Sequence, residues 1–266
     1  QNNKFANQLL GGLALKKGDF IRAQDFIKKA LIVDPDNPEL NSNLGNALLK
    51  LHRLDEAKKH YNKALETEPD YAPAHNGLGA TLREEGNCEE AEKYHVNALE
   101  YQPKNPRLRN NYANTLREMG RTDEAIKQYL LAVECDPHNA DTFYNLGVLH
   151  ENLANDERAY ENYMQALDLC PDHPEANFNL GNVLRRMGKF ETAIEKFQAA
   201  IKARPDYAEA HNNLGHSLRV LGDKKTAEKH WKQAVDMDIQ LADAQVNLGL
   251  ADFEQGDLES GWKRYE

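Results

Sequence analysis

Hydrophobic and polar positions recur along this chain with a period of 34 residues. The period is plainest in the prolines that stand one interval apart: Pro35, Pro69, Pro103, Pro137, Pro171 and Pro205. Ile239 fills the next place in the series. A period held this strictly indicates stacked supersecondary units, not one globular domain with a single active site.

Each unit has two apolar stripes with helical spacing. Counted from three residues after each proline, units begin at residues 4, 38, 72, 106, 140, 174, 208 and 242, and the last is partial. Positions 7, 8 and 11 of a unit share one helical face, and positions 20, 24, 27 and 28 share another. We therefore predict an all-α protein with two amphipathic helices per unit, forming a single array over residues 1–266.

Small residues stand at the same places in every unit. Position 8 is Gly or Ala: Gly11, Gly45, Gly79, Ala113, Gly147, Gly181, Gly215 and Gly249. Position 24 is mostly large: Ile27, Tyr61, His95, Tyr129, Tyr163, Phe197, Trp231 and Tyr265. Because Gly inside a helix costs about 1 kcal/mol against Ala, we expect close packing of two helices beside the large residue to be the reason.

The ends of the helices are marked as well. Position 15 is Gly in six of the eight units, which is a signal for the C-terminus of a helix. The candidate N-caps of the second helices are Asp19, Asn87, Asn155, Asp223 and Asp257. Asn37 and Asn105 each precede a proline and are candidate N-caps of first helices.

This pattern resembles the tetratricopeptide repeat family over essentially the whole chain. The resemblance implies a right-handed α-solenoid superhelix of antiparallel helix pairs, whose first helices line a concave groove for an extended peptide or a partner helix. The segments Asn43–Leu48 and Asn179–Leu184 are most similar to repeats of O-linked N-acetylglucosamine transferases and related bacterial repeat proteins.

Asparagines recur on the helix face that the resemblance assigns to the groove, at positions 2, 6, 9 and 13. Those at position 6 are Asn43, Asn111, Asn145, Asn179, Asn213 and Asn247, with Gly77 as a gap. Those at position 9 are Asn46, Asn114 and Asn182. A carboxamide offers both donors and acceptors, so this Asn ladder can bind the backbone of an extended peptide. The alternative is that these side chains bond across neighbouring first helices, or were inherited by duplication.

Charge is sorted around the ladder. Position 12 carries arginines, namely Arg83, Arg117, Arg185 and Arg219, whereas position 2 is mostly acidic with Arg107 as an exception. The arginines can form a rim that pairs with acidic side chains of a partner. Alternatively, the sorting matches the helix dipole, with acids in the first turn and bases in the last. A co-chaperone clamp is not expected, because position 5 never holds Lys and position 6 never holds Arg.

Composition narrows the class of partner. The net charge of −10 argues against nucleic acid and against an anionic membrane surface. No apolar stretch is long enough to insert in a membrane. Cys88, Cys135 and Cys170 are expected to be reduced, buried thiols in a cytoplasmic protein. We find no catalytic constellation, cofactor motif or metal site, so we expect a non-enzymatic scaffold that binds a protein or peptide.

Two features of the ends widen the functional alternatives. The chain does not begin with Met, and it ends inside the second helix of the eighth unit. We therefore expect truncated termini and a natural chain that continues. One alternative function is the substrate-recruiting part of a protein glycosyltransferase whose catalytic domain is absent from this chain. Another is self-association through the open ends of the array.

Overall fold

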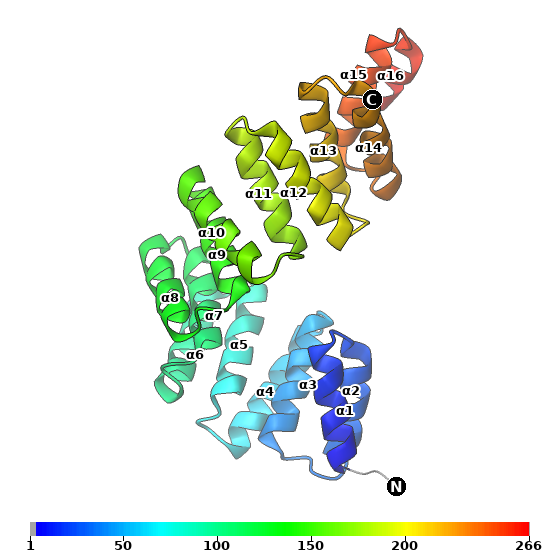
Figure 1. Cartoon of the computed structure of the whole chain (residues 1–266). Helices are drawn as coiled ribbons and strands as arrows, with labels where there is room; N and C mark the ends of the chain where they lie inside the picture. The colour runs from blue at the N-terminus through cyan, green and yellow to red at the C-terminus, as the bar shows by residue number, and fades with distance from the viewer. Residues whose placement is uncertain (1–3, 266) are drawn as a thin grey trace. The chain divides into compact units, whose positions relative to one another are not determined.

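The computed structural model describes residues 4–265, and within that range it holds sixteen α-helices and no strand (Figure 1). The first helices of the eight pairs are α1 (Lys4–Lys16), α3 (Pro38–Lys50), α5 (Ala72–Glu84), α7 (Pro106–Glu118), α9 (Ala140–Asn152), α11 (Pro174–Arg186), α13 (Ala208–Val220) and α15 (Ala242–Glu254). The second helices are α2 (Phe20–Leu31), α4 (Leu54–Thr67), α6 (Cys88–Tyr101), α8 (Thr122–Cys135), α10 (Asp156–Leu169), α12 (Phe190–Ala203), α14 (Lys224–Met237) and α16 (Leu258–Tyr265). The predicted all-α class and every predicted start of a first helix are confirmed.

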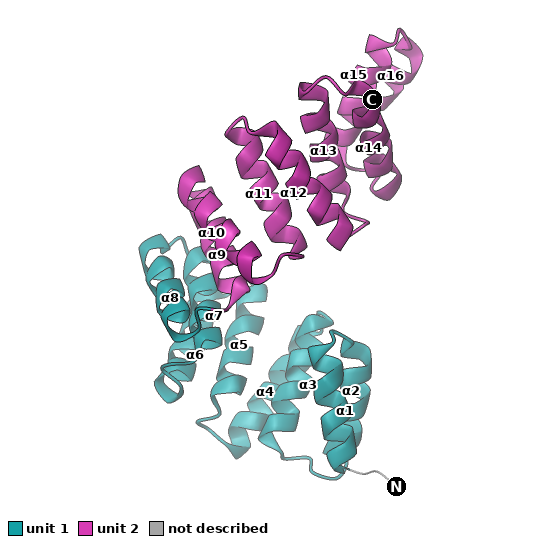
Figure 2. Ribbon diagram, in the orientation of Figure 1, with its two compact units in different colours: residues 1–137 teal, residues 138–266 magenta. Residues whose placement is uncertain are grey.

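The chain divides into two compact units, Gln1–Pro137 and His138–Glu266, called unit 1 and unit 2 below (Figure 2). Unit 1 holds the pairs from α1 to α8, and unit 2 holds those from α9 to α16. In each unit every second helix packs against its own first helix and, where another pair follows, against the first helix of that pair. A single continuous array over the whole chain stays a prediction.

The two layers of each unit differ in how closely their helices approach. In unit 1 the helices α1, α3, α5 and α7 contact one another in series, whereas the second helices of that unit contact only first helices. The same holds in unit 2 for α9, α11, α13 and α15. Each unit therefore curves toward its first helices. We call the inner surface, formed by positions 2, 6, 9 and 13, the first-helix face.

The predicted caps fix where the helices begin and end. Each predicted N-cap side chain accepts a backbone N–H of the first turn: Asp19, Asn37, Asn87, Asn105, Asn155, Asp223 and Asp257. All six glycines at position 15 have φ between 74° and 92°, the left-handed region that favours glycine. His52 and Ala154 occupy the same turn in the two other units, each with φ 55°.

Small residues bring the two helices of a pair together. A Cβ atom placed on Gly45 would lie 2.6 Å from the Tyr61 ring, and one on Gly181 would lie 2.6 Å from the Phe197 ring. The large residues at position 24 are almost fully buried in the seven full units. The predicted close packing is therefore confirmed there, whereas the Tyr265 side chain lies outside the described residues.

Polar side chains at position 4 tie five of the first helices to the turn before them. Asn41 donates to the Pro35 carbonyl at 2.9 Å, and Asn177 donates to the Pro171 carbonyl at 2.9 Å. His75, Arg109 and Gln245 bond the carbonyl six residues earlier in the same way. These five turns are thus held by the following helix, whereas Phe143 at position 4 of α9 has no polar group that could make this bond.

The cysteines correct one expectation. Cys135 and Cys170 are exposed and Cys88 is only partly buried, so the prediction of buried thiols is wrong. The reason is their place in the unit. Cys135 and Cys170 lie at the end of a second helix, beyond the apolar stripe of positions 20, 24, 27 and 28. Cys88 is the first residue of α6.

Candidate functional site

All twelve predicted site residues lie on first helices, and each is partly buried. Those in unit 1 are Asn43, Asn46, Asn111, Asn114 and Arg117. Those in unit 2 are Asn145, Asn179, Asn182, Arg185, Asn213, Arg219 and Asn247. Because neighbouring first helices are in contact, these side chains form a row along the first-helix face of each unit.

In unit 1 the carboxamides at position 9 hold buried tyrosines. The Tyr61 hydroxyl donates to Asn46 Oδ1 at 2.9 Å, and the Tyr129 hydroxyl donates to Asn114 Oδ1 at 2.6 Å. Burial raises the pKa of Tyr129 to about 12. These two asparagines therefore serve the core as well as the face, since a buried hydroxyl needs a hydrogen-bond partner.

Gly77 interrupts the row of unit 1 for a steric reason. A Cβ atom there would lie 2.2 Å from the Tyr61 ring, which is also packed against Gly45. Tyr61 is fully buried and donates to Asn46, so its ring has little room to move. No side chain larger than hydrogen fits at this place, and the gap in the predicted ladder follows from the packing of Tyr61.

In unit 2 the carboxamides are bonded to one another. Asn213 Nδ2 donates to Asn182 Oδ1 at 2.8 Å, and Asn247 Nδ2 donates to Asn212 Oδ1 at 2.9 Å. Asn179 Nδ2 lies 3.3 Å from the Tyr163 hydroxyl, which donates to Glu151. Burial, together with Glu151, raises the pKa of Tyr163.

For part of the ladder, these contacts support the alternative that the asparagines bond across neighbouring first helices. Asn111 in unit 1 also donates across neighbouring first helices, to Asn76 Oδ1 at 3.0 Å. A carboxamide has two N–H donors and an oxygen with two lone pairs. One bond between helices therefore leaves hydrogen-bonding capacity on the same group, and it fixes the direction in which the group points. The ladder is pre-organised, which lowers the entropy lost when a ligand binds.

Sequence reasoning missed the partners of these asparagines. Asn76 and Asn212 at position 5 accept hydrogen bonds from the next unit. An Asn at position 5 followed by an Asn at position 6 of the next unit was the available signal. It was overlooked because contacts between units depend on how closely the first helices approach.

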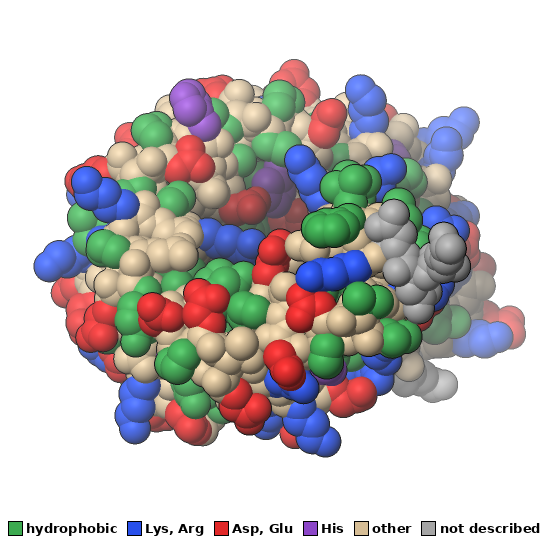
Figure 3. All heavy atoms as spheres, turned by 90° about the horizontal axis from the view of Figure 1, so that it is seen from below, with side chains coloured by type: hydrophobic (Ala, Val, Ile, Leu, Met, Phe, Trp, Pro, Cys, Tyr) green, Lys and Arg blue, Asp and Glu red, His purple; other side chains and the backbone are tan. Residues whose placement is uncertain are grey.

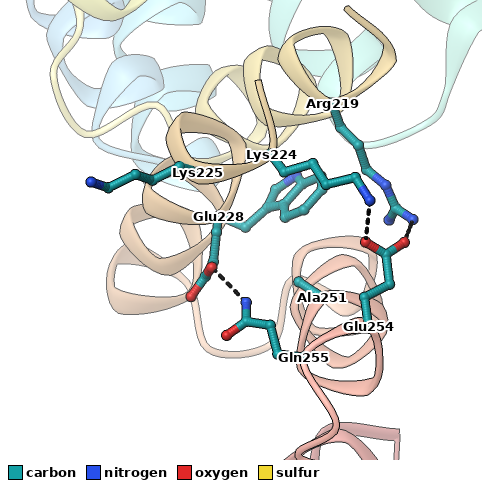
Figure 4. A pocket seen from close by; sticks show the side chains of 8 residues that line it. Arg219, Lys224, Lys225, Glu228, Ala251, Glu254 and Gln255 are labelled. Atoms are coloured by element: carbon teal, nitrogen blue, oxygen red, sulfur yellow. Dashed lines mark hydrogen bonds and ion pairs between the residues drawn. The ribbon is translucent and has the colours of Figure 1, made fainter. Parts of the chain in front are cut away.

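Two of the four arginines at position 12 form ion pairs within the protein. An Arg83 nitrogen lies 3.3 Å from a Glu118 carboxylate oxygen in the next first helix. Arg219 pairs with Glu254, whose other oxygen lies 3.1 Å from Lys224 Nζ (Figure 4). In Figure 4, these groups and the Glu228–Gln255 hydrogen bond at 2.9 Å border a pocket of about 300 Å³. The polar groups along that border are engaged with one another.

Arg185 is placed differently. Its Nε is buried and has no hydrogen-bond acceptor among the described residues. Burial and the neighbouring Arg186 lower the pKa of its guanidinium, while Asp243 opposes this shift. Burial, with Arg185 and Arg219 nearby, also lowers the pKa of His216. Of the predicted rim, Arg185 therefore has the clearest unused capacity to bind an acidic group in unit 2.

A cleft of about 590 Å³ opens on the first-helix face of unit 1. Its lining includes the two ladder residues of α3, Asn43 and Asn46, and it extends to Asn111 of α7. This volume lies within the roughly 300–1,000 Å³ usual for ligand sites. The surface in Figure 3 shows basic and acidic side chains interspersed with hydrophobic ones on the face seen from below.

Two other kinds of site were sought in residues 4–265. No helix in this range is both long and apolar enough to cross a membrane. The same residues contain no cluster of three or more His, Cys, Asp or Glu side chains arranged to hold a metal ion.

The chain matches several family models that describe tetratricopeptide repeats. One, described as "TPR repeat", matches residues 113–153 and 181–222. Three described as "Tetratricopeptide repeat" match residues 14–81, residues 96–127 and 162–195, and residues 140–173. Together they cover well over half of the chain. Comparison with curated proteins finds no match.

Solved structures show the same fold at low sequence identity. The chain is similar to pilF of Pseudomonas aeruginosa, with 23% identity and a TM-score of 0.71 over 82% of this chain and 97% of that one. It is also similar to a chain of the APC/C hetero-tetramer Cut9–Hcn1, with 21% identity and a TM-score of 0.72. That match covers 92% of this chain and 48% of the other, so this chain spans about half of it.

A third similar structure is MamA, with 24% identity and a TM-score of 0.55 over 62% of this chain and 96% of that one. At such identities these likenesses concern the fold alone. The 34-residue period, the paired helices and the matched family models agree, and the chain belongs to the tetratricopeptide repeat family.

Proposed function

We propose that this protein is an interaction scaffold that binds an extended polypeptide along its first-helix face. Repeat proteins of this family typically bind protein partners. The observation that carries the proposal is the row of partly exposed carboxamides along this face. Bonds between neighbouring helices fix the orientation of Asn111, Asn213 and Asn247 in that row. The peptide backbone presents alternating N–H and C=O groups, and a carboxamide can pair with both.

Arg185 gives this face a second kind of contact. Its Nε is buried, so a carboxylate of the bound polypeptide would pair with the terminal nitrogens of the guanidinium. Backbone pairing by the asparagines provides affinity that is independent of sequence, and charge at the rim provides selectivity.

The sequence raised two further roles, recruitment of a glycosyltransferase substrate and self-association. Recruitment of substrate to a glycosyltransferase domain would use the same first-helix face, but the matched family models describe repeats and give no support for a transferase. Self-association would use apolar side chains at the ends of the array, such as Phe5 and Trp262, which are 77% and 63% exposed. Light scattering over a concentration series tests that role directly.

The proposal is tested by replacing Asn145, Asn179 and Asn213 together with Ala. Peptides selected on the wild-type protein from a random library are labelled, and their affinity is measured by fluorescence anisotropy. Since each lost hydrogen bond is worth about 1 kcal/mol, we expect binding to weaken at least about tenfold. Helicity by circular dichroism should stay unchanged.

A matched control removes three asparagines from second helices. Asn62, Asn97 and Asn162 lie on α4, α6 and α10, away from the first-helix face. Their triple replacement by Ala should leave the affinity within about twofold of wild type. Equal binding by both triple variants would contradict the proposal that the Asn ladder binds the peptide.

A further inference from the structure

The cleft of unit 1 carries a charge opposite in sign to that of the whole chain. Four cationic side chains line it (Lys16, Lys50, Arg83 and Arg107), together with one carboxylate, that of Glu84. The chain as a whole has a net charge of −10. Clefts lined by one sign of charge concentrate ligands of the other sign. The local excess of positive charge therefore favours an anionic ligand.

Three of these cations have no acidic partner in the part of the chain that the structure describes. Arg83 pairs with Glu118, but no carboxylate among the described residues lies within 4.0 Å of the side-chain nitrogens of Lys16, Lys50 or Arg107. These three side chains are exposed, so they are free to reorient toward a ligand.

Arg107 is an exception to the pattern of the repeat, whereas Lys16 and Lys50 stand at a position whose charge varies. Lys16 and Lys50 stand at position 13, where the next two units have Glu84 and Glu118. Arg107 stands at position 2, where five other units are acidic. Arg107 also lies close enough to Tyr61 to oppose the rise in its pKa that burial causes. The fold thus brings three cationic side chains from α1, α3 and α7 to one cleft.

The rest of the cleft suits a polypeptide. Carboxamides of Asn43, Asn46, Asn76 and Asn111 line it, and Leu15, Phe20 and Leu49 supply apolar surface. Gly77 leaves the middle of the row without a side chain, so a chain lying there meets no obstacle. Amide groups match a peptide backbone, whereas a long polyanion such as nucleic acid would be repelled by the net negative charge of the protein.

We propose that this cleft selects an acidic segment of the bound polypeptide. Side-chain carboxylates of that segment pair with Lys16, Lys50 and Arg107, and its backbone lies against the asparagines. The inference rests on the proposed function for the polypeptide nature of the ligand, and it adds the chemical class of the segment and the unit that binds it. The guanidinium of Arg107 offers the bidentate geometry that a carboxylate accepts best.

The test uses two labelled 12-residue peptides, three copies of Gly-Glu-Ser-Glu and the same sequence with Gln for Glu. Fluorescence anisotropy gives their affinities for the full chain. We expect the acidic peptide to bind roughly tenfold more tightly, which corresponds to three exposed ion pairs. The preference should fall as salt rises, because charges on an open surface are screened over about 8 Å at 0.15 M.

Two triple variants locate the preference. Replacing Lys16, Lys50 and Arg107 with Gln should abolish it. Replacing Lys59, Lys93 and Lys127 with Gln makes the same change in charge on the exposed faces of α4, α6 and α8, and it should leave the preference intact. All six side chains are exposed, so we expect both variants to fold as wild type, as circular dichroism will check.

The outcomes separate the inference from the proposed function. The inference is overturned if the two peptides bind equally, or if the two charge variants lose the preference for the acidic peptide to the same extent. Neither result counts against peptide binding by the Asn ladder. An acidic preference that depends on the cleft but not on Asn145, Asn179 and Asn213 supports the inference and counts against the ladder. Tighter binding of a labelled twelve-residue oligothymidine than of the acidic peptide overturns the assignment to polypeptide.

Discussion

In unit 2 the asparagines at position 6 run from Asn145 to Asn247 without a break, whereas in unit 1 the same row is interrupted at Gly77. The interruption coincides with an open cleft lined by three cations, Lys16, Lys50 and Arg107, that have no ion pair among the described residues. In unit 2, Asn182 and Asn213 are bonded to each other. One repeat scaffold thus presents a charged cleft in one unit and a bonded row of carboxamides in the other.

The two units also differ in the surroundings of a buried tyrosine at position 24. Tyr61 donates to Asn46 at position 9, and its ring occupies the space beside Gly77. Tyr163 has Val148 at position 9 of its unit and donates instead to Glu151, with Asn179 beside the hydroxyl. Tyr129 also donates to an asparagine at position 9, Asn114, although the next unit carries Asn145 at position 6. The gap at Gly77 therefore follows from the place of the Tyr61 ring and not from this hydrogen bond alone.

The largest expected effect is on stability, from a substitution at Gly77, where the row of unit 1 is interrupted. Gly77→Ala places a Cβ atom 2.2 Å from the buried Tyr61 ring, so we expect a loss of stability of about 2 kcal/mol. Gly12→Ala is the matched control, because a Cβ atom there meets nothing within 4 Å. That change should stabilise α1 by about 0.5–1 kcal/mol. Thermal unfolding followed by circular dichroism measures both, and shifts of the same sign would refute the steric explanation of the gap.

The two units should also differ in how their stability depends on pH, because at position 24 unit 1 has His95 whereas unit 2 has Phe197. Burial lowers the pKa of His95 from 6.5 to about 3, and neither ring nitrogen has a hydrogen-bond partner among the described residues. Between pH 6.5 and pH 3, His95 is therefore protonated in the unfolded chain but neutral in the folded one. The contribution to stability is present above pH 6.5 and is lost below it, by about 1.4 kcal/mol per pH unit at most.

His95→Phe should remove this contribution to the acid sensitivity. Other buried histidines, including His150 and His211, keep their contribution to the acid sensitivity, because burial lowers their pKa values as well. Urea unfolding at pH 7 and pH 5 should show a smaller difference for the variant than for wild type. An unchanged difference would mean that His95 is not buried in the folded protein.

The smallest expected effect is a gain in stability at a turn, and it should be the same in the two units. His52 in unit 1 and Ala154 in unit 2 adopt φ 55° at a place where other units have glycine. Replacing either with Gly should relieve left-handed strain and stabilise the protein by about 0.5–1 kcal/mol. Gly86→Ala and Gly222→Ala are the reverse controls and should lower the unfolding midpoint. If only one of the two replacements raises stability, the two units differ in these turns as well as in their first-helix faces.

The sequence predicted the local structure well because its signals are local. The starts of first helices, the N-caps such as Asp19 and Asn155, and the packing of Gly181 against Phe197 depend on residues within one 34-residue repeat. The partners of the asparagines could not be predicted in the same way. The bonds from Asn111 to Asn76 and from Asn247 to Asn212 join residues 35 apart, and they depend on the approach of neighbouring helices.

Charge was predicted only in part for a similar reason. The arginines at position 12 were identified, but the ion pair of Arg83 with Glu118 needs the spacing between α5 and α7. Lys16 and Lys50 were not singled out, because each is an unremarkable residue in its own helix. Their importance in the proposed cleft follows from their meeting Arg107 of another repeat.

The most direct test of binding along the first-helix face is photo-crosslinking of a bound peptide. The acidic 12-residue peptide is made with a benzophenone residue at its centre and irradiated with the full chain, and the crosslinked residues are identified by mass spectrometry. The account predicts crosslinks to α3, α5 and α7, which line the cleft of unit 1, and their loss when excess unlabelled peptide competes. Competed crosslinks that fall mainly on the second helices α4, α6 and α8 would contradict it.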